Sequence, residues 1–203
     1  MVNIEFKIEG LDKLIKQFGE DNKRIQRATQ RALKDTAKKV KTATAQVMVR
    51  TYALPSARIK QDIHIKWPSY TTPAIVTFSG KSPGLQHYKP RQVIGGVQSF
   101  ISPKSKGSGL AQKKVRGKNK GVSVEVQKGK RRQVKGGFLI TVKTAPGVWR
   151  REGKERLPIE RLYGPSIMGM FNATGGLELT RQVIWENMDK AFTREWEKEL
   201  RRG

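Results

Sequence analysis

The chain contains no cysteine among its 203 residues. This absence excludes disulfide bonds, thiol nucleophiles and zinc sites built on cysteine. Histidine is nearly as scarce: His64 and His87 are the two in the chain, and neither has a second histidine or a carboxylate at the spacing of metal ligands. We therefore expect both histidines to be structural, and we expect the protein to use neither a metal nor another cofactor.

Long hydrophobic runs are also missing. No apolar stretch reaches the roughly 18 residues that mark a membrane-spanning helix. Residues 1–10 alternate polar and apolar side chains and lack the continuous apolar core of a signal peptide. We therefore expect no membrane segment, and we expect the protein to be made and kept in the cytoplasm or in a particle assembled there.

Acidic residues are few: 17 Asp and Glu stand against 42 Lys and Arg, and the formal net charge is +25 at pH 7. Repulsion among so many like charges disfavours a compact free monomer unless an anionic or oligomeric partner offsets it. Nucleic acid and an acidic protein surface are the two candidate partners. Aromatic residues make up 7% of the chain and are not interleaved with the cations, so stacking platforms for single-stranded nucleic acid are not expected.

Motifs for catalysis are lacking as well. No glycine-rich phosphate-binding loop and no G-x-S-x-G nucleophile turn is found between an expected strand and helix. The acidic residues lie mostly in the terminal helical segments at surface spacing, and they are not clustered as in metal-dependent nucleases. We therefore expect that the protein is not an enzyme.

Periodic apolar residues predict two long helices and several short strands. One helix is expected over residues 21–52, which contain neither proline nor glycine and repeat small apolar residues every three or four positions. A second helix, rich in acidic residues, is expected over residues 177–201. Strands are expected at residues 2–8, where polar and apolar residues alternate, and at residues 63–67 and 74–78 as antiparallel neighbours.

These elements predict an α+β fold, in which a long N-terminal helix and a C-terminal helix pack on an antiparallel β-sheet. We expect a single domain over residues 1–203, with a basic and flexible insertion. The first long helix is basic and the last is acid-rich. Their opposite charges favour pairing, either within one subunit or between neighbouring subunits.

Residues 81–137 contain the insertion, in which glycine, serine and lysine are abundant. Between Lys104 and Lys135 the sequence holds twelve cations and one anion, Glu125. Such a run repels itself and is expected to be flexible in the free monomer. Within it, residues 122–126 (VSVEV) are expected to pair with residues 138–142 (FLITV), which makes the connection between them a cationic hairpin.

This hairpin is the candidate contact for an anionic partner, through Lys128, Lys130, Arg131, Arg132 and Lys135. Cations on such a hairpin can follow the phosphates of nucleic acid or line up with an acidic protein groove. The alternative is that a basic loop only keeps the protein soluble.

Residues 154–171 (KERLPIERLYGPSIMGMF) combine many apolar side chains with charges, two prolines and two glycines. The residue before Pro158 must be extended, and Gly164-Pro165 forces a turn after which Ser166 can start a short helical turn. The segment is either a plug for the core of its own chain or a docking loop that meets a neighbouring subunit. The candidate docking residues are Leu157, Pro158, Ile159, Leu162, Tyr163, Gly164, Pro165, Ile167, Met168, Met170 and Phe171.

The same segment carries a resemblance to a known family. Its pattern K-x-R-x-P-I-x-x-L-x-G-P-S, from Lys154 to Ser166, follows the apolar strand at residues 138–142 and precedes a charged closing helix. This order resembles the prophage minor tail protein Z family of tailed bacteriophages. The specific match covers roughly residues 135–202, whereas the basic helix at residues 21–52 is compatible with the family without being diagnostic.

The resemblance implies a structural virion protein that completes the head-proximal end of a phage tail. It implies a homo-oligomeric ring, commonly sixfold, that joins the tail tube and tail terminator to the head–tail connector around the DNA channel. It also implies a location in the virion tail, after assembly in the host cytoplasm, and it favours docking over plugging for residues 154–171. Any DNA contact is expected to be directed at the backbone and sensitive to salt.

Two other functions remain open. The main alternative is a non-sequence-specific nucleic-acid-binding protein, which would also be basic and free of cysteine. Such a protein has no need for the apolar side chains of residues 154–171, so that segment distinguishes the two readings. An enzyme of DNA processing is the third and weakest reading, because catalytic residues are missing.

Overall fold

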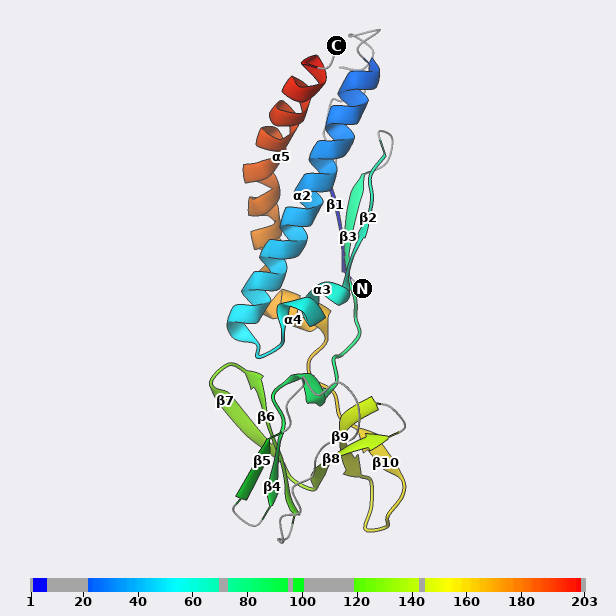
Figure 1. The fold of residues 1–203 in the computed structure, drawn as a ribbon, viewed down its shortest axis with the longest axis vertical. Coiled ribbons are helices and arrows are strands. Elements are labelled where there is room, and N and C mark those ends of the chain that lie inside the picture. Colours follow the sequence, from blue (N-terminus) through cyan, green and yellow to red (C-terminus); the bar gives the residue numbers. More distant parts are fainter. Residues whose placement is uncertain are drawn as a thin grey trace. The chain divides into compact units, whose positions relative to one another are not determined.

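The computed structural model describes residues 2–6, 22–69, 73–94, 97–100, 119–142 and 145–201 (Figure 1). The chain divides into two compact units. We call the first the helical unit; it comprises Met1–Met48, Ser56–Gly80 and Ile167–Gly203. The second, which we call the strand unit, comprises Val49–Pro55 and Lys81–Ser166. The predicted α+β fold class is confirmed.

The helical unit is built on two long helices, α2 (Asn22–Thr51) and α5 (Gly176–Leu200). Both follow the predicted ranges closely. The last turn of α2 belongs to the strand unit, and Pro55 stops the helix from continuing. Two shorter helices, α3 (Ser56–Gln61) and α4 (Ile167–Ala173), complete the helical part.

The sheet of the helical unit has three antiparallel strands in the order β1-β3-β2. They are β1 (Val2–Phe6), β2 (Ile63–Lys66) and β3 (Ala74–Phe78). Strand β3 lies in the middle and buries Ala74, Val76 and Phe78 on one face, as its period-two pattern requires. The sheet lies along one side of α2 and α5 along another (Figure 1).

Small residues let these layers approach closely. Ala28, Ala32 and Ala37 of α2 are fully buried. At the end of the core near α4, the rings of Phe78 and Phe171 lie 4.1 Å apart between centroids. Burial of such apolar surface is the main source of stability for a unit of this size.

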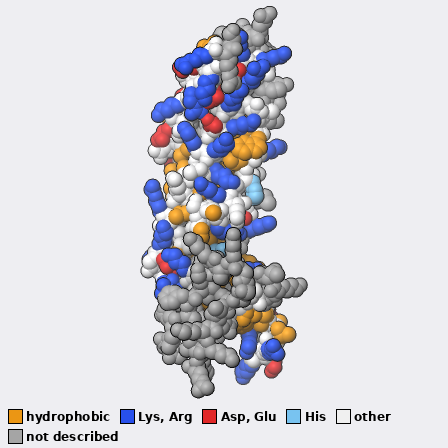
Figure 2. Space-filling model, in the orientation of Figure 1, with side chains coloured by type: hydrophobic (Ala, Val, Ile, Leu, Met, Phe, Trp, Pro, Cys, Tyr) orange, Lys and Arg blue, Asp and Glu red, His pale blue; other side chains and the backbone are white. Residues whose placement is uncertain are grey.

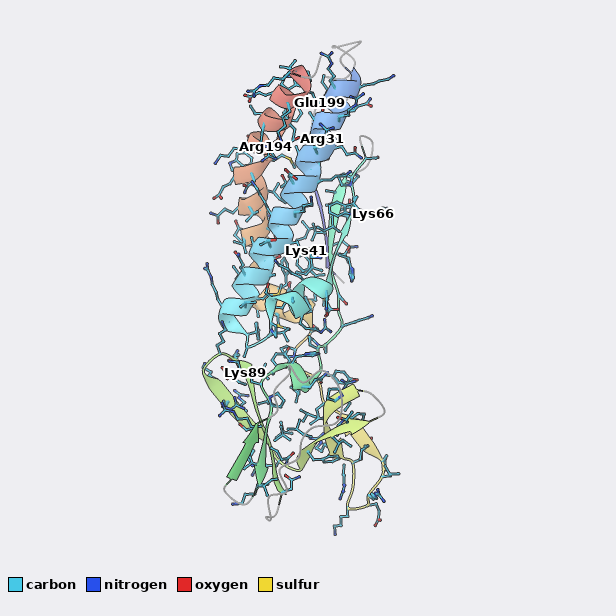
Figure 3. All side chains as sticks on the ribbon, in the orientation of Figure 1. Arg31, Lys41, Lys66, Lys89, Arg194 and Glu199 are labelled. Atoms are coloured by element: carbon cyan, nitrogen blue, oxygen red, sulfur yellow. The ribbon has the colours of Figure 1, made fainter. Side chains whose placement is uncertain are left out.

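Charges join α2 to α5 within the chain. Arg31 forms an ion pair with the buried carboxylate of Glu199 (Figure 3). Arg27 lies 3.6 Å from the other carboxylate oxygen of Glu199, and Arg194 pairs with Asp35. The predicted pairing of a basic and an acid-rich helix is therefore confirmed, and it forms inside one subunit.

The strand unit holds two antiparallel sheets. The first has the order β5-β4-β6-β7 and consists of β4 (Arg91–Ile94), β5 (Val97–Phe100), β6 (Asn119–Gln127) and β7 (Lys130–Val134). The second has the order β10-β9-β8 and consists of β8 (Gly137–Val142), β9 (Ala145–Arg151) and β10 (Ile159–Arg161). A short 3-10 helix, η2 (Leu85–His87), precedes β4.

The predicted pairing of residues 122–126 with residues 138–142 is wrong. Strand β6 pairs with β7 and β4, whereas β8 pairs with β9. Two glycines with positive φ explain this different pairing. Gly129 (φ 75°) forms a tight turn that leads directly into β7, and Gly136 (φ 71°) forms a second turn before β8. The predicted long connection is thus itself a strand.

The predicted insertion is partly regular structure. Its described parts, residues 81–94, 97–100 and 119–137, contribute η2 and strands β4 to β7. The end of β6 is joined to the end of α2, because Ala53 donates a backbone hydrogen bond to Val126, and Lys128, just after β6, donates one to Thr51. The remainder, residues 95–96 and 101–118, lies outside the described residues.

Candidate functional site

The hairpin formed by β6 and β7 carries exposed cations. Lys128 lies at its turn, Lys130 and Arg132 alternate along β7, and Lys135 follows the strand; all four side chains are exposed. Strand β7 is one of the two edge strands of its sheet. Charged side chains on an edge strand disfavour pairing with further strands. The hairpin therefore presents positive charge to solvent along a sheet edge.

Arg131, the fifth predicted contact for an anionic partner, differs from these four in its burial. Period-two alternation turns its side chain toward the sheet, where it is half-buried. Its guanidinium lies 3.3 Å from the Glu125 carboxylate and donates hydrogen bonds to the backbone oxygen of Lys89 (2.8 Å) and to Ser123 (Oγ, 3.2 Å; backbone O, 3.1 Å). We therefore assign Arg131 a structural role.

Electrostatics fixes this pair in its charged form. The backbone N–H of Gly129 is the main cause that lowers the pKa of Glu125, with Lys89 and Arg131 acting in the same direction against burial. Burial, followed by repulsion from Arg91, lowers the pKa of Arg131, but arginine stays protonated at any physiological pH. Glu125 is thus neutralised locally and does not offset the charge of the exposed cations.

The four exposed cations suit a flat or extended anionic partner. Among the residues that the structure describes, no ion pair involves Lys128, Lys130, Arg132 or Lys135. Lysine and arginine side chains without carboxylate partners can contact phosphates or carboxylates without the free-energy cost of breaking an existing ion pair. Nothing in their arrangement selects a base sequence, so a nucleic-acid contact here would be directed at the backbone.

The apolar segment at residues 154–171 is divided between the two units. Its first part is fixed to the strand unit by its backbone: Leu162 donates to Val148 O, and Gly164 donates to Pro83 O. A side chain at Gly164 would collide with the buried ring of Tyr88. The segment is therefore held in place and is not a free arm.

Two large apolar side chains of this first part point into solvent. Leu157 is 67% exposed and Tyr163 is 56% exposed. The neighbouring Pro158 is exposed as well, whereas Ile159, Leu162, Gly164 and Pro165 are half-buried. The guanidinium of Arg161 lies 5.9 Å from the centre of the Tyr163 ring and covers part of one face.

The second part, which was expected to form the apolar tip of a docking loop, lies in the core instead. Ile167, Met170 and Phe171 are fully buried in the helical unit, and Met168 is half-buried. The reason is helical spacing: α4 begins at Ile167, so residues three and four apart share one face, which packs on β3 through Phe78. For these three residues the plug interpretation is the correct one.

A groove of about 610 Å³ in the helical unit was not foreseen from the sequence. It is lined by Lys38 and Lys41 of α2, by Lys60 of α3, and by His64 and Trp67 at β2. Two local signals existed, since Lys38 and Lys41 are three residues apart on one helix and Lys60 and His64 are four apart. The approach of these two segments is tertiary, and no local pattern reveals it.

Side chains of the kinds that bind metal ions are not clustered in the described residues. Within them, no group of three or more His, Cys, Asp or Glu side chains is arranged to hold a metal ion. His64 is exposed on β2, and His87 lies in η2 near Gln86. Of the helices in this part of the chain, none has the length and apolar character needed to cross a membrane.

Comparison with known proteins gives one result. A sequence model of the family described as "Prophage minor tail protein Z (GPZ)" matches residues 8–203. No curated protein and no solved structure shows significant similarity to the chain.

Proposed function

The chain belongs to the prophage minor tail protein Z family, and from this premise we propose that it completes the head-proximal end of a phage tail. Membership makes it a structural protein of the tail, located in the virion and in contact with other tail or virion components. The finer proposal is a closed ring of identical subunits, six in number, around the channel for DNA. Such a ring would join the tail tube and terminator to the head–tail connector.

The exposed side chains of Leu157 and Tyr163 carry this proposal. Large apolar side chains that are more than half exposed, on a segment whose backbone is held by hydrogen bonds, are typical of a preformed contact surface. We assign them, with Pro158, to the contact with a neighbouring tail subunit. Ile159 and Leu162 are half-buried in the same segment, and Gly164 and Pro165 set its turn.

The exposed cations of the β6–β7 hairpin are assigned to the DNA backbone. Lys128, Lys130, Arg132 and Lys135 lie on or directly beside an edge strand, without carboxylate partners among the described residues. A subunit beside a DNA channel can use such side chains to screen phosphates, with an affinity that falls as salt rises. The interior of the ring is therefore the expected place of this hairpin.

The same cations favour one alternative function. A non-sequence-specific nucleic-acid-binding protein would also present an exposed basic edge. It would not require exposed Leu157 and Tyr163, however, and it would bind duplex DNA in the absence of any tail protein. Removing the hairpin cations would then abolish its activity, whereas a tail-completion protein would still assemble.

In vitro complementation tests the proposed function. Tails assembled without this protein are mixed with DNA-filled heads, with or without the purified protein, and infectious particles are counted. The protein is expected to be required, and preincubation with tails is expected to be more effective than preincubation with heads. Equal numbers of infectious particles in its absence would contradict a role in tail completion.

A further inference from the structure

The groove in the helical unit is a concentration of positive charge with a partly apolar floor. Lys38 and Lys41 reach it from α2, and Lys60 reaches it from α3. Figure 3 shows Lys41 on α2 and Lys66 on the neighbouring strand β2. Lys66 does not line the groove, although it lies on the same strand as His64, which does. Figure 2 shows further Lys and Arg side chains over the visible face of α2 and α5.

Among the described residues, no carboxylate lines this groove. The nearest acidic residue in sequence, Asp62, is mostly buried and forms an ion pair with Arg58 on α3. None of the ion pairs found among the described residues includes Lys38, Lys41 or Lys60. Burial, and then repulsion by Lys60, lowers the pKa of Lys41 from its ordinary value. The fold thus keeps these lysine ammonium groups close to one another, and their mutual repulsion lowers its stability.

The groove also offers apolar surface beside these charges. Trp67 is 51% exposed, and the ammonium of Lys38 lies 5.9 Å from the centre of its ring. Ile65 of β2 is half-buried and adds an aliphatic wall. A ligand that fits must therefore bring negative charge together with at least one apolar group.

We propose that this groove binds an acidic segment of another protein, whose carboxylates contact Lys38, Lys41 and Lys60 while an apolar side chain packs on Trp67 and Ile65. The partner is a different protein, because a second copy would bring a further net charge of +25 toward a cationic groove. The proposal does not depend on where in the tail the protein lies.

Shape favours a protein segment over duplex DNA. Lys41 is half-buried and lines the groove together with residues of α3 and β2. A flexible aspartate or glutamate side chain can reach a half-buried ammonium group more readily than a phosphate on the convex surface of a stiff duplex can. The exposed cations of the β6–β7 hairpin are more accessible to duplex DNA. We therefore expect a binding experiment to distinguish the two surfaces: the groove should bind an acidic peptide and the hairpin should bind duplex DNA.

The test uses two probes and two matched variants of the full chain. The probes are a fluorescent peptide, Glu-Glu-Leu-Glu-Glu, and a fluorescent duplex of about 20 base pairs. The first variant carries K38Q, K41Q and K60Q. The control carries K23Q, K66Q and K190Q, three exposed lysines outside the groove, so both variants lose the same charge.

The groove variant is expected to bind the peptide about tenfold more weakly than the control, with duplex affinity equal in the two variants. Equal loss of peptide affinity in both variants would mean only non-specific attraction and would overturn the proposal. Selective loss of duplex affinity in the groove variant would assign the groove to nucleic acid and would overturn it too.

Cross-linking of the unmodified protein provides an independent measurement. A carbodiimide joins peptide carboxylates to nearby lysine amines, and mass spectrometry identifies the lysines. Lys38, Lys41 and Lys60 are expected to carry most of the cross-links, although exposed lysines are more numerous elsewhere. If the cross-links are instead distributed in proportion to the exposure of each lysine, the groove is not a specific binding site for the peptide.

Discussion

Arg131 and Arg132 are adjacent residues of the same type, but their side chains have different roles. Arg131 holds Glu125, Ser123 and the backbone of Lys89 together, whereas Arg132 extends into solvent. The sequence places both in one basic run, and composition gives no reason to separate them. Only the alternation of β7, once its boundaries are known, assigns one to the sheet and one to solvent.

Arg131→Gln is therefore expected to destabilise the strand unit by about 1–3 kcal/mol, because Glu125 loses its closest cationic partner and several hydrogen bonds are lost. Arg132→Gln is the matched control and is expected to change the free energy of unfolding by no more than about 0.5 kcal/mol. Urea unfolding followed by circular dichroism measures both. Equal effects on stability would refute the structural assignment of Arg131.

Glu195 is a second residue whose role depends on its partners. It is 5% exposed on α5 and accepts hydrogen bonds from Lys198 (2.8 Å) and Arg194 (3.0 Å). Lys198 is the main cause that lowers the pKa of Glu195, and Arg194 adds to it against burial. Because the folded pKa lies below the unfolded one, the carboxylate stabilises the fold above about pH 4.5 and loses this effect as pH falls.

Glu195→Gln is expected to lower the melting temperature at pH 7 by about 2–4 °C. The difference from the unmodified protein should shrink as the pH falls below about 4, where the native carboxylate becomes protonated too. Glu197→Gln, at an exposed position of the same helix, serves as the control and should leave the melting temperature nearly unchanged. A difference for Glu195→Gln that is independent of pH would contradict the charge-based explanation.

At the scale of elements, the sequence predicted helices better than strand pairing. The two long helices and the strands of the helical unit follow local periodicity, which a single sequence displays. The pairing of β6 with β7 depends on Gly129, and the packing of α4 depends on a long-range contact with Phe78. Residues 154–171 could not be divided into contact surface and core from composition alone, because large apolar side chains occur in both parts.

The exposed part of this segment makes a prediction about assembly. The double substitution Leu157→Ser and Tyr163→Ser is expected to weaken cosedimentation with tails lacking the protein by about tenfold or more, since two apolar side chains leave the contact. The double substitution Leu177→Ser and Leu200→Ser changes two exposed leucines of α5, which are 48% and 50% exposed. This control should still cosediment, and both variants should keep the native melting temperature. If the variant with Leu157→Ser and Tyr163→Ser cosediments with tails as well as the control does, these residues are not a docking surface.

At the scale of the whole molecule, the net charge of +25 was the strongest indication of anionic partners in the sequence. The structure separates that charge into three roles: ion pairs that join α2 to α5, an exposed basic edge on β7, and a cationic groove in the helical unit. Composition predicts the first role only as a tendency of two helices to pair. The other two depend on which side chains the fold leaves without carboxylate partners.

Cryo-electron microscopy of tails with and without this protein is the most direct test of the central claim. Symmetry-free reconstruction would reveal the difference density and its position along the tail. The account predicts a closed ring of six copies at the head-proximal end, around an open channel. Difference density at the opposite end of the tail, or a single copy outside any ring, would contradict it.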